Sequence, residues 1–417
     1  MEDLSILNAS ELITLSPGKP RGGHSMEEIG ILKGASISIK GGKISSIGAP
    51  KSANKEIDAH GKVVMPGFVD PHTHLIFAGS REEEFELRIM GKSLLLQDAK
   101  ASFCTPKYGI ISTVMSTRKA TESELKRSAL KRLNYALKWG TTTMEVKSGY
   151  GLSLKDELKI LRVIKKLNKS HPISLIPTFL GAHEIPPERS KKEYIHDLLT
   201  ELIPVASKFA QFCDVFCEKG VFTKEEARKI LERGKEFGLL PKIHADELSN
   251  SGGSELAGEI GAVSADHVVY PGANGIKWLA TGGLKKSGTI AVLLPGTCLF
   301  LGHSPLRSEP PVKKLIDACI PIALGSDFNP GTSPILSMPI IMALGCLLLN
   351  LTPAQVITAS TINAAHAIGV GDKVGSLEVG KDADILILGV SSYREIPYWL
   401  GFNPVQIVIK KGNIIEI

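Results

Sequence analysis

Long hydrophobic runs and a recognisable targeting segment are absent from the sequence. Its longest apolar stretch, residues 340–349, covers about half of the roughly 20 residues that a membrane-spanning helix needs. The chain begins Met1, Glu2, Asp3 and has no basic segment followed by an apolar one, so we expect no secretory signal. The apolar stretch predicts a buried helix, and we expect no membrane partner.

Paired cysteines and a strong excess of one charge are also absent. The cysteines form no CxxC pair, which is typical of reduced thiols in a cytoplasmic protein. The 49 Lys and Arg residues exceed the 43 Asp and Glu residues by only 6, and the excess is spread along the chain. This dispersed charge argues against a nucleic-acid partner, although a mild positive field would favour an anionic small-molecule substrate.

Both ends of the chain carry short strand-and-turn patterns. At the N-terminal end, residues 35–39 and 43–48 flank a Gly41-Gly42 turn. At the C-terminal end, the same pattern occupies residues 384–388, 405–410 and 414–417. We therefore expect residues 1–64 and 365–417 to form one small composite β-sandwich domain, with two separate extensions as the alternative.

The middle of the chain, residues 65–364, alternates predicted strands with charged amphipathic helices such as residues 122–139 and 155–167. Eight strands alternating with helices indicate a parallel sheet, and eight is the number that closes a (β/α)8 TIM barrel. The fold class is therefore α/β. The strand candidates are residues 63–69, 142–146, 174–179, 214–217, 241–244, 264–269, 289–294 and 321–324.

The segment MPGFVDPHTH at residues 65–74 carries the strongest functional pattern. In extended backbone, residues i and i+2 face the same way, so His72 and His74 present two imidazoles to one point. They follow the first predicted strand, at the end of a barrel where active sites lie. Because imidazole is the commonest protein metal ligand, this pair predicts a metal site.

Four more polar residues stand at the ends of later predicted strands: His183, His244, His267 and Asp327. A lone histidine there would more often be a packed core residue. Repeated polar residues at the same end of successive strands have no packing rationale, and in a barrel they converge. Three histidines and one aspartate suit Zn²⁺, with Fe²⁺ or Mn²⁺ as alternatives. An open coordination position would hold water, whose pKa a metal lowers towards about 7.

The sequence favours one metal ion per chain. Lys147 is the only lysine near a strand end that could bridge two metals after carbamylation, and we do not assign it that role. The remaining histidines lie away from strand ends and are not expected to be ligands; they are His24, His60, His171, His196, His303 and His366.

At these residues the chain resembles the amidohydrolase superfamily. The HxH pair and Asp327 are superfamily-wide, and residues 375–384 are similar to the superfamily's return into its β-domain. Narrower elements are similar to those of hydrolases that open an imidazolone ring bearing a propanoate chain. These elements are AGSR at 78–81, EFELR at 84–88, EVKSGYGL at 145–152, FLGAH at 179–183, HADELS at 244–249 and DFNPGTSP at 327–334.

The resemblance implies a barrel with one catalytic divalent metal, Zn²⁺ or Fe²⁺, and roles for individual residues. The metal ligands would be His72, His74, His244 and Asp327. The catalytic groups would be Glu247 as acid/base, His267 beside the attacking water, and Asp327. The substrate contacts would be Arg81, Tyr150, His183, Glu247, Asn329, Gly331 and Thr332. A homodimer is also implied.

Two features depart from this pattern. The loop at residues 91–109 is longer and lacks a glycine-rich run, and Phe328 replaces a smaller residue. Two rival functions remain, a deaminase of a cyclic base and a barrel that has lost catalysis and serves as a binding protein. Arg81 favours a carboxylated ring over a base, because its planar fork matches a carboxylate. The complete ligand set argues against a catalytically dead barrel.

Overall fold

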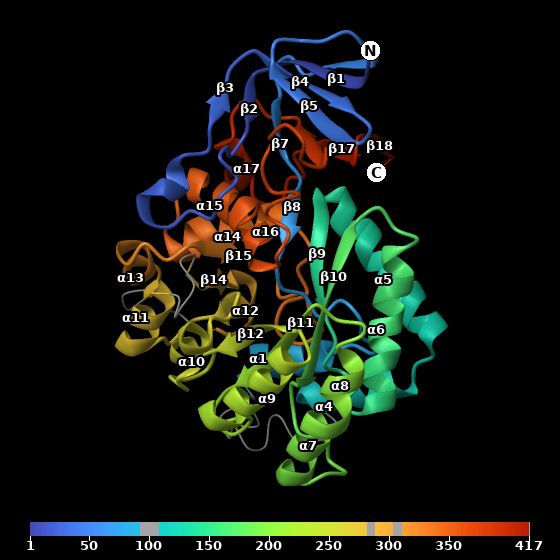
Figure 1. Ribbon diagram of the computed structural model, residues 1–417, viewed down its shortest axis with the longest axis vertical. Helices are drawn as coiled ribbons and strands as arrows, with labels where there is room; N and C mark the ends of the chain where they lie inside the picture. Colours follow the sequence, from blue (N-terminus) through green and yellow to red (C-terminus); the bar gives the residue numbers. More distant parts are fainter. Residues whose placement is uncertain (92–107, 282–287, 303–310, 417) are drawn as a thin grey trace.

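The computed structural model describes residues 1–91, 108–281, 288–302 and 311–416 (Figure 1). In Figure 1, strands from both chain ends form the upper part of the molecule, and a barrel of strands wrapped in helices forms the lower part. Within the described residues, no helix combines the length and apolar character that crossing a bilayer requires.

Eight parallel strands form the barrel in sequence order, which confirms the predicted (β/α)8 fold. The first and last strands approach each other at their carboxyl ends, where the Asp327 amide donates to the His72 carbonyl at 2.9 Å and the His74 amide to the Phe328 carbonyl at 2.9 Å. These two bonds draw residues of the proposed metal site together across the barrel seam. The strands are β8 (Phe68–Asp70), β9 (Thr141–Lys147), β10 (Ser174–Ala182), β11 (Phe212–Cys217), β12 (Leu240–Ala245), β13 (Ser264–His267), β14 (Ile290–Leu293) and β15 (Ile322–Leu324).

Helices cover the outside of this barrel. Several begin at a capping box, as at Thr121, whose hydroxyl accepts from the Glu124 amide while the Glu124 carboxylate accepts from the Thr121 amide. The predicted apolar helix is present and largely buried as α14. The helices are α1 (Glu82–Ile89), α4 (Gly109–Lys119), α5 (Glu122–Lys138), α6 (Leu154–Asn168), α7 (Lys191–Asp197), η2 (Leu198–Leu202), α8 (Ile203–Ala206), α9 (Lys224–Glu236), α10 (Gly253–Ile260), α11 (Ala273–Thr281), α12 (Pro295–Leu301), α13 (Pro311–Asp317), α14 (Met338–Leu349), α15 (Pro353–Ala359) and α16 (Ile362–Ala367).

The two chain ends build two further sheets, in the orders β5-β4-β1-β6 and β18-β17-β16-β7-β2-β3. Buried side chains from both sheets, including Ile6, Ile37, Val64 and Ile385, form one apolar cluster. This shared core confirms the composite β-sandwich. Its elements are β1 (Glu2–Ala9), β2 (Glu11–Ile13), η1 (Gly23–Glu27), β3 (Ile31–Leu32), β4 (Ala35–Lys40), β5 (Lys43–Gly48), β6 (Ala53–Asp58), β7 (Val63–Pro66), β16 (Ile385–Leu388), α17 (Glu395–Tyr398), β17 (Val405–Lys410) and β18 (Asn413–Ile415).

The predicted strand at residues 63–69 is divided between the two units. β7 pairs with β16 and β2 in the sandwich, whereas β8 pairs with β9 in the barrel. Gly67 lies between them, and a Cβ there would stand 2.3 Å from the Thr142 hydroxyl oxygen. The close backbone approach at this glycine lets the chain pass from one sheet to the other, so the first barrel strand begins at Phe68.

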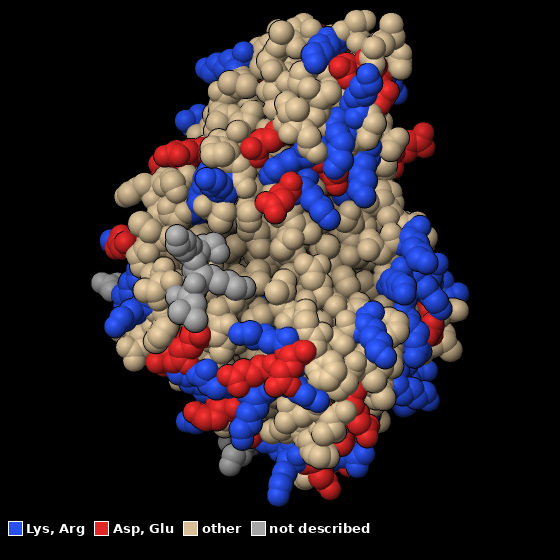
Figure 2. Space-filling view, viewed as in Figure 1, with Lys and Arg blue, Asp and Glu red and all other residues tan. Residues whose placement is uncertain are grey.

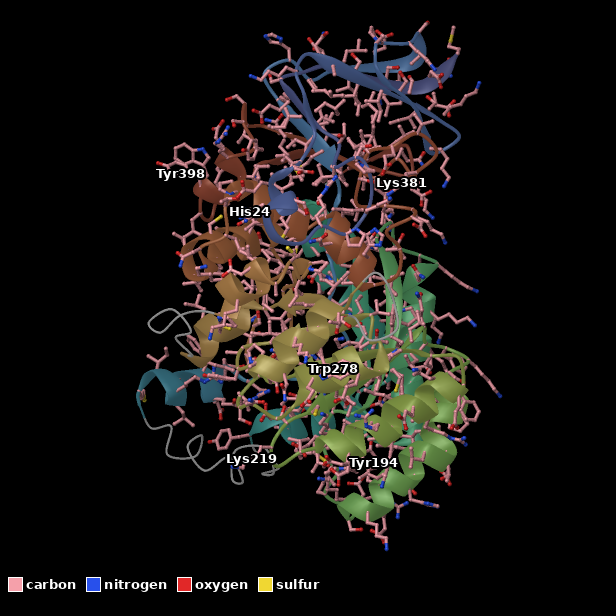
Figure 3. The ribbon with its side chains drawn as sticks, turned by 60° about the vertical axis from the view of Figure 1, so that its left-hand side comes forward. His24, Tyr194, Lys219, Trp278, Lys381 and Tyr398 are labelled. Carbon is pink, nitrogen blue, oxygen red and sulfur yellow. The ribbon has the colours of Figure 1, made fainter. Side chains whose placement is uncertain are left out.

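The surface carries charges of both signs. Figure 2 shows Lys and Arg side chains interspersed with Asp and Glu over the face in view. Large apolar side chains also reach solvent near α17, where Tyr398 is 72% exposed and points away from the protein (Figure 3).

Candidate metal and substrate site

The predicted site residues come from the carboxyl ends of six barrel strands. His72 and His74 follow β8, Tyr150 follows β9, and His183 follows β10. Two residues adopt left-handed backbone, His267 at φ 75° and Asp327 at φ 50°. Such backbone is uncommon outside glycine and gathers at functional sites, where the surrounding structure enforces it.

Four potential ligand atoms converge at one point. Nε2 of His74 lies 3.4 Å from Nε2 of His244 and 3.4 Å from Oδ1 of Asp327, and Nε2 of His72 lies 3.5 Å from the same Oδ1. Ligands held about 2.0–2.1 Å from a tetrahedral ion have similar mutual spacing. Nε2 of His72 and Oδ1 of Asp327 are buried without a hydrogen-bond partner. Orphaned buried acceptors cost free energy unless a ligand satisfies them, so this donor set fits a divalent metal ion.

Three imidazoles of the site, those of His72, His74 and His267, have lowered pKa values, which favours their neutral form. Burial lowers the pKa of His72 and of His74 well below its usual value, and neighbouring positive groups lower both further. Burial likewise lowers the pKa of His267 to about 3. Neutral imidazole is the form that binds a metal, so no proton has to leave these side chains at neutral pH.

A second layer of carboxylates orients the histidines, and sequence analysis missed it. Oδ2 of Asp266 lies 2.6 Å from Nδ1 of His72, which turns Nε2 of that ring towards the convergence point. Oδ2 of Asp214 lies 3.0 Å from Nδ1 of His244, within ion-pair distance. Both aspartates occur inside predicted strands. A charged residue in a buried strand has no packing role, and this was the signal in the sequence that could have indicated their function.

Lys147 is buried below the ligands, with its Nζ 2.7 Å from Asp214 and 2.9 Å from Glu145. These contacts occupy its ammonium group. Cys213 and Cys217, on β11, are buried free thiols.

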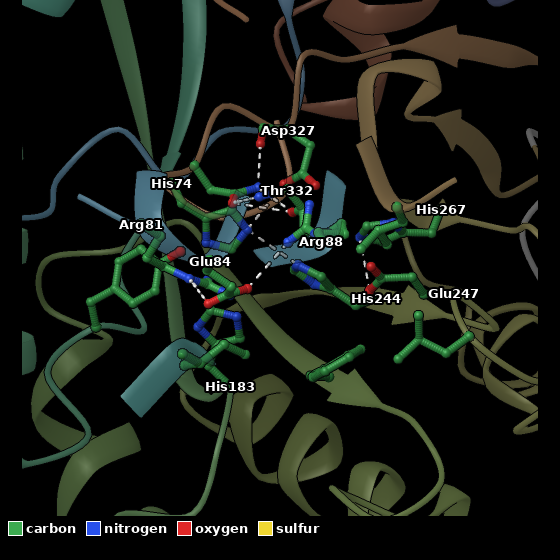
Figure 4. Close-up of a pocket in the computed structure, with 16 residues that line it drawn as sticks. His74, Arg81, Glu84, Arg88, His183, His244, Glu247, His267, Asp327 and Thr332 are labelled. Carbon is green, nitrogen blue, oxygen red and sulfur yellow. Dashed lines mark hydrogen bonds and ion pairs between the residues drawn. The ribbon is translucent and has the colours of Figure 1, made fainter. Parts of the chain in front are cut away.

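A cavity of about 100 Å³ is lined by three of the four proposed ligands, His74, His244 and Asp327. Figure 4 draws the residues that line it, among them His74, His244 and Asp327 and the charged side chains of Arg81, Glu84 and Arg88. Of the predicted substrate contacts, Arg81, Tyr150, His183, Glu247, Asn329 and Thr332 line this cavity.

The loop after β15 forms part of the wall of this cavity and is held by Asn329. Its side-chain oxygen accepts from the Gly331 and Thr332 amides, each at 2.8 Å, and its Nδ2 donates to the Asp327 carbonyl at 2.7 Å. Gly331 does not line the cavity itself, but the space beside it is filled by the Arg81 guanidinium. The loop therefore contacts both Asp327, a proposed metal ligand, and the guanidinium of Arg81.

Glu247 and His267 face each other beside the ligand atoms, with Oε2 and Nε2 3.5 Å apart. Burial raises the pKa of Glu247 well above its usual value, and the negative charge of Asp327 adds to this effect. The raised pKa favours the protonated form of Glu247, which can act as a proton donor.

Residues predicted to be outside the site do lie elsewhere. His24 belongs to η1, which packs against α13 and α15 (Figure 3). His171 contacts Asn134, and His366 contacts the Gly18 carbonyl. His303 and most of the divergent loop at 91–109 fall outside the described residues. Phe328 is buried, with its ring 5.8 Å from that of Phe77.

Comparisons with known proteins identify the family to which the chain belongs. Residues 63–415 match the model of the amidohydrolase family. The imidazolonepropionase of Geobacillus kaustophilus is 44% identical, with 100% of this chain and 98% of that protein covered, and the imidazolonepropionase of Symbiobacterium thermophilum is 44% identical, with 99% and 97% covered.

Solved structures share the fold at much lower identity. A zinc-bound adenosine deaminase from Xanthomonas campestris superposes with a TM-score of 0.70 at 17% identity, covering 99% of this chain and 92% of that one. A 5-methylcytosine deaminase from Klebsiella pneumoniae gives 0.70 at 18%, covering 99% and 98%. The chain therefore belongs to the amidohydrolase family and, within it, to the imidazolonepropionases.

Proposed function

We propose that this protein hydrolyses the cyclic amide of 4-imidazolone-5-propanoate to N-formimidoyl-L-glutamate, a step of histidine degradation. The observation that carries the proposal is the convergence of four buried ligand atoms beside a cavity that holds two arginines. The converging ligand atoms suit hydrolysis of an amide, and the two arginines suit a ring that carries a negatively charged propanoate. The relatives that share 44% identity carry the corresponding name.

His72, His74, His244 and Asp327 would hold one divalent ion, Zn²⁺ or Fe²⁺. A bound ion of this kind polarises a carbonyl and lowers the pKa of a coordinated water towards about 7. Asp266 lies beside His72 and Asp214 beside His244. These two carboxylates determine which nitrogen of each imidazole ring faces the site.

Side chains of the protein accept and donate the protons of the reaction. Oδ2 of Asp327 accepts from the Thr297 hydroxyl at 2.5 Å, which holds the carboxylate in place while it takes a proton from the attacking water. His267, neutral at its lowered pKa, orients that water. Glu247, whose raised pKa favours the protonated form, gives its proton to the ring nitrogen as the carbon–nitrogen bond of the amide breaks.

The propanoate group is directed by charge. Arg81 and Arg88 contribute two positive charges to the cavity and Glu84 one negative charge, so the three side chains carry a net charge of +1. Charge-assisted hydrogen bonds from a guanidinium would fix the carboxylate end and place the ring carbonyl near the ligand atoms.

The assay that tests this function follows loss of imidazolone propanoate and formation of N-formimidoyl-L-glutamate by the purified protein, before and after metal removal. Ammonia release from guanine and cytosine is measured in parallel. Turnover of the imidazolone alone supports the proposal. Ammonia release without imidazolone turnover contradicts it and identifies a deaminase, and inactivity on both substrates of metal-loaded protein identifies a binding protein.

We further propose a cytoplasmic homodimer, on the support of the family resemblance and of the free thiols among the described cysteines. Light scattering coupled to gel filtration tests the oligomeric state.

A further inference from the structure

We propose that Lys147 and Lys242 are positioning residues for the metal centre: buried beneath it, they hold the two carboxylates that orient His72 and His244. This inference rests on the metal centre of the proposed function. It assigns a task to Glu145, Lys147 and Lys242, three buried charged residues that the chemistry described above does not use.

The layer consists of two lysines and three carboxylates inside the barrel, each with a fully buried side chain. Nζ of Lys147, at the end of β9, lies 2.7 Å from Asp214, 2.9 Å from Glu145 and 3.4 Å from Asp266. Nζ of Lys242, on β12, lies 3.1 Å from Glu145 and 3.5 Å from Asp266. Strands β9, β11, β12 and β13 are thus connected across the barrel interior.

The same carboxylate oxygens contact both the lysines and the proposed ligands. Oδ2 of Asp266 faces Nδ1 of His72 and both ammonium groups. Oδ2 of Asp214 faces Nδ1 of His244 and the Lys147 ammonium. Each imidazole is therefore one oxygen atom away from Lys147, and a shift of that ammonium would move both aspartates and, through them, both rings.

Stability alone does not explain this layer. The interior of a (β/α)8 barrel is normally filled by branched apolar side chains, and buried ion pairs are often no more stabilising than apolar residues of similar volume. With three negative and two positive charges, the layer has a net charge of −1 directly below the ligand nitrogens. That charge favours a cation above it. The contact with Asp266 directs Nδ1 of His72 downwards, so that Nε2 remains available to the ion, and Asp214 lies at ion-pair distance from Nδ1 of His244.

The test measures Zn²⁺ affinity of the full-length, metal-stripped chain by competition with a chromophoric chelator. Glu145→Gln/Lys147→Met removes one charge of each sign, so the net charge of the layer is unchanged while Asp214 and Asp266 lose their shared donor. We expect the affinity to fall by about 10- to 100-fold, the usual cost of losing a group that orients a ligand.

A matched control is available in the β-sandwich. Lys410 and Asp384 form an ion pair there at 2.5 Å, with side chains only 5% and 2% exposed. Lys410→Met/Asp384→Asn removes a buried pair of the same kind away from the barrel. This control should lower the melting temperature of the metal-free protein and leave the Zn²⁺ affinity within twofold of the parent.

The outcomes separate the two proposals. If the parent chain takes up no Zn²⁺ at stoichiometric concentration, the proposed metal centre itself is wrong. If the parent binds Zn²⁺ and folded E145Q/K147M binds it within twofold of the parent, the positioning role is wrong while the centre stands. If E145Q/K147M does not fold, the variant E145Q/K147Q is measured instead, because its amides fill nearly the same space. The same twofold limit on Zn²⁺ affinity then decides whether the positioning role is wrong.

Discussion

Arg81 and Glu84 form a two-point ion pair at the mouth of the cavity, with Nε to Oε2 at 2.9 Å and Nη2 to Oε1 at 2.6 Å. The pair is nearly buried, with side chains 10% and 7% exposed, so it differs from an ordinary surface contact. Because Glu84 occupies one edge of the guanidinium, a substrate carboxylate would meet the remaining Nη1 end. Arg88 also pairs with Glu84, which leaves the group with a surplus positive charge.

Arg81→Ala should lower kcat/KM for the imidazolone by about 30-fold or more, because losing a buried charged contact costs roughly 2–5 kcal/mol. Arg81→Lys should recover only part of the loss, since an ammonium lacks the planar fork. Metal content should not change. Steady-state kinetics with metal analysis test this, and Arg162→Ala, at an exposed pair with Glu122, is the control. A kcat/KM within threefold of the parent would remove Arg81 from substrate recognition.

Gly331 leaves room for Arg81, because a Cβ at this position would lie 2.1 Å from Nη1. Gly331→Ala should therefore displace the guanidinium and lower kcat/KM by about 10- to 100-fold, as small misplacements of a binding group do. The decisive measurement is a double-mutant cycle. In an Arg81→Ala background the alanine at 331 should have little further effect, and full additivity of the two losses would show that Gly331 acts independently.

The sequence was most informative where a short pattern sets geometry locally. His72 and His74 share a face because extended backbone alternates, and strand ends meet in a barrel whatever the loops do. The division of residues 63–69 between two sheets could not be predicted in this way. Nothing local distinguishes β7 from β8, since each is apolar and its partner strand is remote in the sequence. The domain limits at 64/65 and 364/365 stay a prediction.

The roles of Asp214 and Asp266 were missed for a related physical reason. A charge inside a predicted strand indicates only that some partner exists, and both aspartates find theirs on other strands: Lys147 on β9, Lys242 on β12 and His244 on β12. Such pairings depend on barrel closure. The assignments of individual substrate contacts remain predictions, although the structure places Arg81 at the cavity.

His72→Ala or His244→Ala should abolish turnover and reduce bound metal to near zero while the barrel stays folded, because both residues lie at the catalytic end and not in the packed core. The parent should retain one tightly held ion per chain. Elemental analysis and circular dichroism check both statements. His171→Ala, outside the site, should keep its metal. Two tightly bound ions per parent chain, both required for activity, would contradict a mononuclear centre.

Glu184 should make the protein less stable as the pH rises. Burial raises its pKa from 4.5 to about 7, so the folded chain holds a proton there that the unfolded chain releases above pH 4.5. Its contribution to the free energy of unfolding therefore falls as the pH rises from about 4.5 to 7. Glu184→Gln should remove this loss and be more stable than the parent by up to roughly 3 kcal/mol at pH 8, with a smaller difference at pH 5.

Urea unfolding at both pH values measures this difference. Exposed Glu232→Gln on α9 should follow the parent at both pH values. A stability gain for Glu184→Gln that is equal at pH 5 and pH 8 would show that the carboxyl group does not titrate in this range.

Glu247→Gln should lower kcat by about 100- to 10,000-fold, the usual contribution of a positioned acid or base, because an amide can hydrogen-bond to the ring nitrogen but cannot protonate it. Metal content should change little, since Glu247 is not among the proposed ligands, and KM should change little because the amide keeps the hydrogen bond to the substrate. Because the protonated form of Glu247 is the active one, and burial together with Asp327 raises its pKa, the parent's kcat should fall at alkaline pH as the coupled site loses that proton. The residual activity of the glutamine variant should lack this alkaline fall.

Exposed Glu232→Gln serves again as the control. If Glu247→Gln keeps kcat within fivefold, or if its rate falls at the same alkaline pH as the parent's, another group protonates the leaving nitrogen and Glu247 only shapes the cavity.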